Sequence, residues 1–186
     1  MALLSVLTGS GSPITWASHH MYHHKHSDSE LDLHSPKKGF LYTALLWPID
    51  NLYYQNNFKF VPKHLIKNKI LIYIHNNYFL IWTALIVCFA LVDIKFLLFF
   101  ILAPAGWTLL HSNVLNNYLA HTKLPGSYRT FDLNDHSHNN KLLQLFMLGD
   151  GLHNNHHKYM NNYNQAILPN EFDPAAWVID KFIKIS

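Results

Sequence analysis

The longest apolar stretch of the chain runs from Tyr78 to Leu110, and only Asp93 and Lys95 interrupt it with charge. A single helix over these 33 residues would be about 50 Å long, against a hydrocarbon core of about 30 Å. The pattern therefore predicts two helices that meet near Val92–Lys95, forming a transmembrane hairpin over about residues 78–110. A helical hairpin buried inside a soluble protein is the alternative.

The segments before the hairpin have a different character. Met1–Trp16 is apolar, but a full membrane span needs about 20 residues. A signal peptide would have basic residues before its apolar part, and this segment has none, so we expect it to be the end of a span that begins outside the chain. Gly39–Lys69 mixes aromatic residues with lysines, which predicts an interfacial segment containing short helices.

After the hairpin, Leu110–Ala120 is expected to continue as a helix that leaves the membrane. A polar loop region follows at Thr122–Asn140, and Lys141–Tyr159 has a helical pattern with two glycines in it. The tail from Pro169 is amphipathic. The elements are thus all helical, and 186 residues suffice for a single domain, taken as residues 1–186.

Composition narrows the class of protein further. Only 13% of the residues are charged, against about 25% in a typical soluble domain, which favours a lipid environment. The single cysteine, Cys88, excludes an internal disulfide and thiolate-rich metal sites. Basic residues form no stripe, so no nucleic-acid partner is expected. Of the 14 Lys and Arg residues only Lys95 lies in the hairpin, so both flanks are predicted to be cytoplasmic.

Histidine is the outlier, with 15 copies, and the motif H-x-x-H-H occurs at residues 20–24 and again at 153–157. On a helix, positions i, i+3 and i+4 share a face, so three imidazoles of each motif can converge on one or two metal ions. Surface histidines at helical spacing are the alternative for either motif alone. Asn117 and His121 form a weaker third element at spacing i, i+4, in which the Asn can hold a metal-bound water.

The type of metal follows from the ligands. Imidazole sites suit Fe, Zn, Cu and Ni, and seven histidines are too many for one ion, which indicates two ions. Hydrolytic zinc pairs usually include carboxylates, and acids near the motifs are few: Asp28, Glu30, Asp32 and Asp150. Imidazole-rich ligation beside a membrane favours di-iron oxygen chemistry.

These motifs resemble those of the integral-membrane fatty acid desaturases, in particular the acyl-CoA Δ9 (stearoyl-CoA-type) branch. Trp16–Trp47 is similar to the second histidine box of that branch and the acidic segment after it, including the Gly39-Phe40 pair. Gly149–His157, G-D-G-L-H-N-N-H-H, is similar to the third box. Asn117–His121 is similar to the N-x-x-x-H of the fourth transmembrane helix.

The resemblance implies a helical integral-membrane bundle with a cytosolic, histidine-rich, metal-binding cap. It implies two non-haem irons with dioxygen as co-substrate, and Asn117 as a ligand through water. Asp150, Asn154 and Asn155 are candidates for orienting the ligand rings, and simple helix capping is the alternative for them. The implied iron ligands are His20, His23, His24, His121, His153, His156 and His157.

The implied reaction places a cis double bond, at Δ9 in this branch, into a fatty acyl chain carried by CoA or by a membrane lipid. We expect the hairpin and Met1–Trp16 to line an apolar tunnel for that chain. Electrons would come from an external cytochrome b5-like or ferredoxin-like donor, since the sequence has no haem, flavin or iron–sulfur motif.

One departure from the family pattern affects activity. The family has an earlier box, H-x-x-x-x-H, and only an apolar segment precedes Trp16 here. A second chain could supply the two missing ligands, or the chain could be a fragment, or an inactive remnant. A related membrane lipid hydroxylase is a further alternative. Unused histidines could also replace the missing ligands: His19, His26, His34, His111, His136 and His138.

Overall fold

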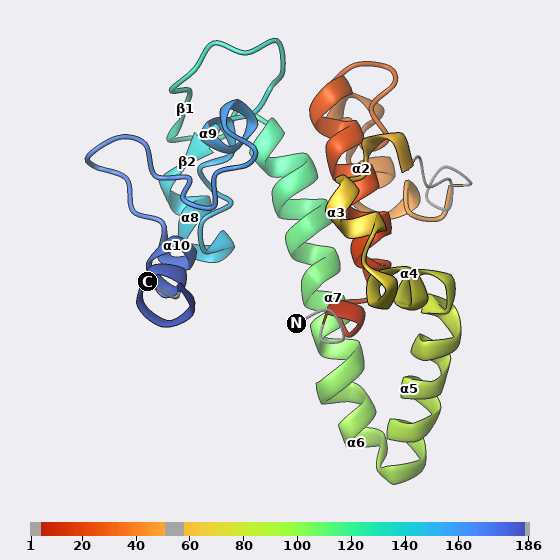
Figure 1. Cartoon of the computed structure of the whole chain (residues 1–186). Helices are drawn as coiled ribbons and strands as arrows, with labels where there is room; N and C mark the ends of the chain where they lie inside the picture. Colours follow the sequence, from red (N-terminus) through yellow and green to blue (C-terminus); the bar gives the residue numbers. More distant parts are fainter. Residues whose placement is uncertain (1–4, 51–57, 185–186) are drawn as a thin grey trace.

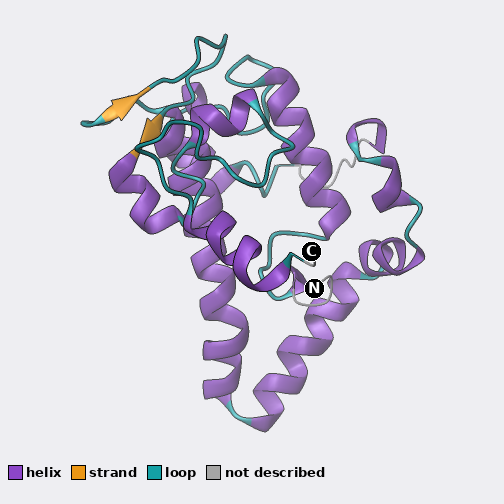
Figure 2. Ribbon diagram, turned by 60° about the vertical axis from the view of Figure 1, so that its left-hand side comes forward, coloured by secondary structure: helices purple, strands orange, loops and turns teal. Residues whose placement is uncertain are grey.

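The structure is a computed structural model that describes residues 5–50 and 58–184. A helical hairpin forms a stem, and the remaining helices gather as a cap around the end of its longer arm (Figures 1 and 2). Apart from one antiparallel pair of two-residue strands, β1 (Ser127–Tyr128) and β2 (Asn139–Asn140), the regular elements of the described residues are helical. The predicted all-α fold is therefore confirmed, with this short strand pair as the exception.

The first H-x-x-H-H motif lies on helix α2 (Pro13–His26). Ser12 caps this helix by accepting a hydrogen bond from the backbone N–H of Thr15 at 3.1 Å, and Pro13 occupies its first turn. Ile14 is buried from solvent against Val61 and Leu71, which fixes α2 beside the start of the stem.

Short helical pieces connect α2 to the stem, and all but the first lie in Gly39–Lys69, where the sequence predicts them; residues 51–57 of that range lie outside the described residues. They are η1 (Pro36–Lys38), η2 (Tyr42–Leu46), η4 (Phe58–Phe60) and α3 (Lys63–Ile66). Of the N-terminal apolar segment, residues 1–4 lie outside the described residues. Val6 packs against Ile74 and Tyr78, so the described part of this segment contacts the stem.

The stem is the predicted hairpin. Helix α4 (Lys69–Asn76) leads into α5 (Tyr78–Val92) with a bend of 70°. Asp93 breaks the helix with an extended backbone, and its carboxylate caps the next helix by accepting from the N–H of Lys95 at 2.8 Å. The break within Val92–Lys95 confirms the predicted meeting point of the two arms.

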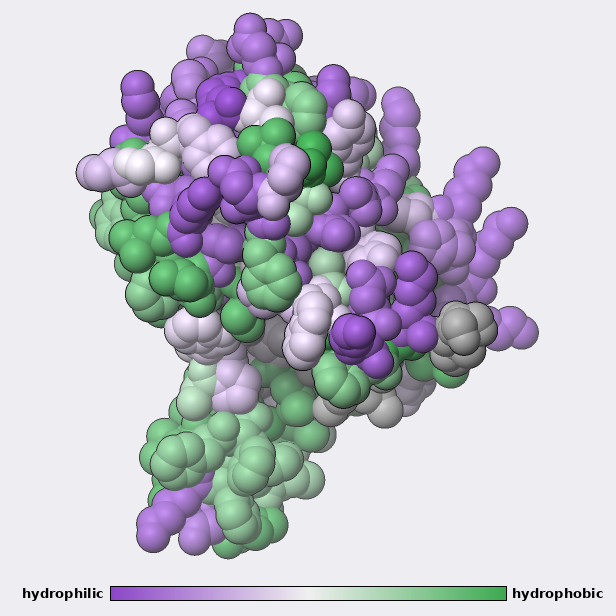
Figure 3. All heavy atoms as spheres, turned by 90° about the vertical axis from the view of Figure 1, so that its left-hand side faces the viewer, coloured by the Kyte–Doolittle hydropathy of each residue, from purple (hydrophilic) through white to green (hydrophobic). Residues whose placement is uncertain are grey.

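The second arm is one continuous helix over Ile94–His121, 28 residues long. It consists of α6 (Ile94–Leu97), η5 (Leu98–Leu102), α7 (Ala103–Leu109), η6 (Leu110–Tyr118) and η7 (Leu119–His121). Only 11% of its apolar window is buried within the described structure, whereas the core helix of a soluble protein is mostly buried. The stem presents an apolar surface below a mostly polar cap (Figure 3). Among the described residues, the helix Ile94–His121 is the one single helix that is long and apolar enough to cross a membrane. The bent pair α4–α5 could form a second span.

The C-terminal part of the cap holds the second H-x-x-H-H motif. Its elements are α8 (Lys141–Met147), α9 (His153–Lys158), α10 (Pro174–Val178) and η8 (Ile179–Ile183). Leu143 and Met147 pack against Ala120, which joins α8 to the end of the long helix. The turn between α8 and α9 brings Gly151 against the backbone of Gln144, at a position where a Cβ atom has no room.

Candidate metal centre

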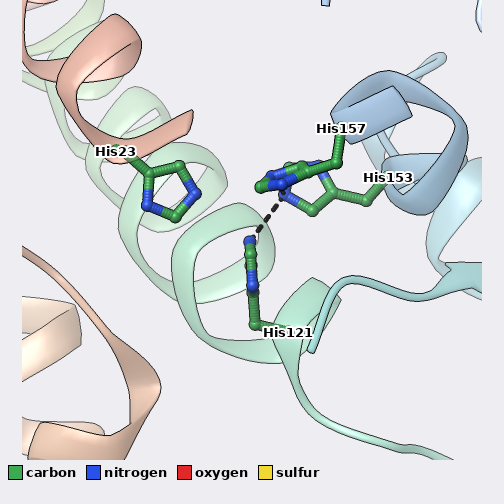
Figure 4. Close-up of side chains that lie close together, drawn as sticks. All are labelled: His23, His121, His153 and His157. Carbon is green, nitrogen blue, oxygen red and sulfur yellow. Dashed lines mark hydrogen bonds between the residues drawn. The ribbon is translucent and has the colours of Figure 1, made fainter. Parts of the chain in front are cut away.

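Three stretches that are far apart in the sequence meet where the long helix ends. Helix α2 approaches from one side with its histidines, α9 approaches from the other, and His121 lies between them at the last position of η7 (Figure 4). Each H-x-x-H-H motif divides its rings between two groups. The i and i+4 histidines of a motif join one group, and the i+3 histidine joins the other.

The first group, here called the four-histidine group, consists of His23, His121, His153 and His157. The Nε2 atom of His153 lies 2.9 Å from Nε2 of His121 and 3.1 Å from Nε2 of His157. The coordinating atoms of all four rings lie within 4.8 Å of one another. Three of these residues are buried and His157 is partly buried.

Three aspartates hold the outer nitrogens of this group. Asp28 accepts from Nδ1 of His121 at 2.8 Å, and Asp32 accepts from Nδ1 of His23 at 3.0 Å. Asp135 accepts from Nδ1 of His157 at 2.9 Å. Among the described residues, Nδ1 of the fourth ring, His153, has no hydrogen-bond partner. An ionised carboxylate can only accept, so in the neutral form of each bonded ring the proton sits on Nδ1 and Nε2 presents a lone pair.

This proton arrangement is the test of whether the group suits a metal ion. Three Nε2 lone pairs point into one small space, and only His153 can offer an N–H there, to one neighbour at a time. Hydrogen bonds among the rings therefore cannot satisfy the group, whereas one cation would satisfy all four nitrogens. Four imidazoles with carboxylates behind them are the donor set of a transition-metal site.

The second group, here called the three-histidine group, consists of His20, His24 and His156. Their Nε2 atoms form a triangle with sides of 2.9, 3.1 and 3.2 Å. All three residues are partly buried. The ring of Trp16 stacks on His20 with centroids 4.6 Å apart, which covers one side of the triangle.

The two groups are adjacent, and burial lowers the pKa of several of their rings. The ring centroids of His24 and His157 are 4.5 Å apart. Burial, followed by the neighbouring His156 and His23, lowers the pKa of His20 to about 3. Burial first, and then neighbouring histidines, lowers the pKa of His156 to about 4 and holds that of His157 well below its usual value. Unprotonated rings at neutral pH are what metal coordination requires.

These pKa shifts predict that acid destabilises the metal-free chain. In the unfolded chain a histidine takes up a proton near pH 6.5, whereas His20 and His156 in the folded chain do so only near pH 3–4. The unfolded state then binds more protons between about pH 6.5 and 4, so stability falls as the pH is lowered through this window. Thermal unfolding of the metal-free chain in detergent, followed by circular dichroism, should show a midpoint that decreases over this window. A flat midpoint would contradict it.

The carboxylates are not the residues expected from the sequence. Asp150 accepts from Gln165 and lies 3.9 Å from His111, and it contacts neither histidine group. Asn154 accepts from the backbone N–H of Thr130 and Phe131, and so joins α9 to the loop that contains Asp135. Asn155 is bonded to Asn139. The expected orienting role of Asp150, Asn154 and Asn155 is therefore wrong for direct contact with the rings.

The acidic segment after the first motif was the available clue for Asp28 and Asp32. Asp28 directly follows the C-cap of α2 and has a left-handed backbone, with φ of 57°, which turns its side chain back toward the long helix. It also accepts from the backbone N–H of His136 at 2.6 Å. No sequence spacing indicated Asp135, because it lies in the polar loop and reaches His157 only through the fold.

The unused histidines do not complete the three-histidine group. None of His19, His26, His111, His136 or His138 lies in a metal-type group of the described residues. His34 lies in one with His23 and Asp32, but its Nδ1 is 3.9 Å from the nearer oxygen of Asp32. Asp32 already accepts from His23 and from two backbone N–H groups, so this set positions His23.

A cavity of about 400 Å³ adjoins the three-histidine group. It follows the long helix from Leu102 to Asn117, a distance of about 20 Å at the usual helical rise. Trp82, Ala105 and Leu109 give its stem end an apolar wall, next to the polar Thr8 and Ser10, in keeping with the expected apolar tunnel. Its other end is polar, with Trp16 and these side chains: His19, His20, His34, Asn113, Asn116 and Asn117. Such a shape suits a long apolar chain with a polar or reactive end near the histidines.

Comparison with known sequences agrees with this chemistry. The sequence model of the family described as "Fatty acid desaturase" matches residues 1–172. The chain is 30% identical over its whole length to "Delta-9 acyl-lipid desaturase 2" of Arabidopsis thaliana, of which it covers 60%. It is 30% identical to "sn-2 palmitoyl-lipid 9-desaturase" of Nostoc sp. (strain 36), with 96% of the chain and 63% of the relative aligned.

A third relative has a different carrier in its name. "Acyl-CoA 5-desaturase AL21" of Anemone leveillei is 27% identical over 91% of the chain and 52% of its own length. The chain thus spans about 50–60% of the length of these curated relatives.

Proposed function

The chain belongs to the fatty acid desaturase family, a family of oxidoreductases, and on this premise we propose that it is an oxygen-dependent fatty acyl desaturase. The product we propose is a cis double bond at Δ9, the position in the names of the Arabidopsis and Nostoc relatives. The observation that supports this most is the meeting of seven histidines in two adjacent groups at the end of an amphipathic cavity.

In this proposal two iron ions occupy the two groups. The four-histidine group would hold one and the three-histidine group the other, with Asn117 acting through water from the cavity wall. Bound there, the irons would supply the one-electron chemistry with which dioxygen removes hydrogen from unactivated methylene groups. In total, two hydrogens leave adjacent carbons, and with two protons and two electrons they reduce dioxygen to two waters.

The chain's own residues would place the substrate and keep the ligands in order. The apolar end of the cavity, with Trp82 and Leu109, would hold the acyl chain and exclude water. Asp28 and Asp32 would keep the protons of His121 and His23 on Nδ1 and so leave Nε2 free to bind metal. The acyl carrier in this proposal is CoA or a membrane lipid, in line with the names of both kinds of relative.

The surroundings are part of the proposal. The apolar hairpin would lie in the membrane, and the excess of Lys and Arg outside it favours a cytoplasmic position for both histidine groups. Electrons would come from an external cytochrome b5-like or ferredoxin-like protein. A second polypeptide with an H-x-x-x-x-H box could add ligands to the three-histidine group.

Product analysis tests this function. The chain would be expressed with a reductase and either donor in a host that lacks Δ9 desaturation, and its lipids analysed by mass spectrometry after derivatisation of double bonds. A new cis double bond between C9 and C10, counted with the carboxyl carbon as C1, is expected. An alcohol at that position would support a lipid hydroxylase instead.

A negative result is informative when the iron content is known. No alkene from a chain with two irons bound would contradict the proposal. No alkene from a chain with fewer irons would support a split enzyme or an inactive remnant. Co-expression with an H-x-x-x-x-H polypeptide would distinguish these two, since it should restore the product only for a split enzyme.

A further inference from the structure

The two histidine groups differ in the number and burial of their ligands. The four-histidine group has four imidazoles, of which His23, His121 and His153 are buried. The three-histidine group has one imidazole fewer, and each of its residues is partly exposed. A transition-metal ion at the second group would therefore keep more positions for solvent or other ligands.

The groups differ still more in what holds their rings. Three rings of the four-histidine group donate Nδ1–H to aspartates, of which Asp28 and Asp32 are buried and Asp135 is partly buried. In the part of the chain that the structure describes, the rings of the three-histidine group form side-chain hydrogen-bonding contacts only with each other. Their orientation rests on helix packing and, for His20, on stacking against Trp16.

The aspartates are themselves held in place. Arg129 donates to the carbonyl oxygens of Asp135 at 2.6 Å and Leu133 at 2.7 Å, which closes the loop that carries Asp135. Asp32 accepts from the backbone N–H of Asp28 at 2.8 Å, so the carboxylates behind His23 and His121 form one network. The four-histidine group is thus fixed before any ion arrives.

Buried carboxylates also give the four-histidine group negatively charged surroundings. Asp28 and Asp32 have side-chain exposures of 1% and 0%, and an anion in such a place is stable only beside compensating charge. A divalent cation at the four-histidine group would be neutralised by these carboxylates, whereas no carboxylate of the described residues is hydrogen-bonded to a ring of the three-histidine group.

We propose that the two groups are unequal metal sites, so that the chain by itself binds one divalent ion tightly at the four-histidine group and a second one weakly and exchangeably at the three-histidine group. The inference rests on the proposed function only for the role of the ions in catalysis. The binding of the ions does not depend on that function. Loss of one outer carboxylate usually lowers metal affinity about 10–100-fold. With three such partners on one side only, we expect affinities that differ by at least about 100-fold.

The experiment is a metal titration of the full chain in detergent. Fe²⁺ without oxygen and Co²⁺ are the probes, and Co²⁺ also reports imidazole ligation through its visible absorption. We expect one equivalent to stay bound through gel filtration with a weak chelator and a second to be removed. Two equivalents that bind with equal affinity, or that leave together, would overturn the inference.

Two substitutions assign the equivalents to the groups. Asp135→Asn should weaken the tight equivalent about 10–100-fold and leave the weak one unchanged. His156→Ala should remove the weak equivalent and leave the tight one. Asp132→Asn is the matched control for the first, because Asp132 is exposed in the same loop. Equal weakening of both equivalents by Asp135→Asn would count against the inference.

Folding is checked by thermal unfolding of each metal-free variant. If Asp135→Asn does not fold, Asp28→Asn replaces it, because Asn tolerates the left-handed backbone of that position. A chain that binds metal as expected but forms no alkene would contradict the proposed function and leave this inference intact. A chain that forms alkene with two equally tight ions would contradict this inference and leave the proposed function intact.

Discussion

The substitution His153→Ala is expected to abolish tight metal binding and, with it, alkene formation. His153 offers its Nε2 to the centre of the four-histidine group, within 3.1 Å of Nε2 of both His121 and His157. Removal of a direct ligand should cost more than the roughly 10–100-fold that an outer partner costs. The measurements are metal retained per folded chain and the yield of the unsaturated product.

His153 is the best ligand to remove because its loss leaves no carboxylate unpaired. Its Nδ1 has no hydrogen-bond partner among the described residues, whereas His23, His121 and His157 each satisfy a buried aspartate. Stability should therefore change less than in His121→Ala, which leaves Asp28 uncompensated. His64→Ala, at an exposed position of α3, is the matched control. Wild-type metal content in His153→Ala would exclude the four-histidine group as the tight site.

Gly151→Ala is expected to disrupt the cap without touching any histidine. A Cβ atom at Gly151 would overlap the backbone N and Cα of Gln144, and a backbone cannot rotate away as a side chain can. Overpacking of this kind costs about 1–3 kcal/mol, and each kcal/mol lowers the unfolding midpoint by about 2–4 °C in a chain of this size. Since Gly151 lies two residues before His153, metal content should fall as well.

The control for this steric effect is Gly106→Ala. No atom lies within 4 Å of a Cβ built at Gly106, which is in helix α7, so the added methyl group meets open space. Its unfolding midpoint should be at or slightly above that of the wild type, because Ala favours a helix over Gly by about 0.5–1 kcal/mol. If Gly151→Ala unfolds at the wild-type temperature and retains metal, the turn between α8 and α9 is not the rigid support that the structure indicates.

Much of the fold follows from local pattern. The hairpin turn was predicted at Val92–Lys95 and occurs at Asp93, because a charged residue that caps a helix interrupts an otherwise apolar run. The helix through residues 110–120 and the helices on either side of the Gly149–Gly151 turn were likewise expected. Each of these features depends on residues that are close in sequence, where periodicity and capping decide.

The orienting groups of the site could not be predicted in this way. Asn154 and Asn155, adjacent to the histidines, bind α9 to the loop in front of it. The rings are instead held by Asp28, Asp32 and Asp135, and Asp28 is 93 residues from the ring that it contacts. Contacts over such a separation depend on how helices pack, and no spacing in one sequence reports them.

Residue identity and helical spacing were enough to indicate the chemistry of the centre, because they alone make a cluster of imidazoles suited to metal. They could not divide the seven rings between two groups. This division follows from how the helices pack. The i, i+4 pair and the i+3 ring of one motif point in different directions from their helix, so they meet different rings of the other motif. The tertiary structure also gave the buried carboxylates to one group only, because three aspartates from two separate loops lie behind the four-histidine group.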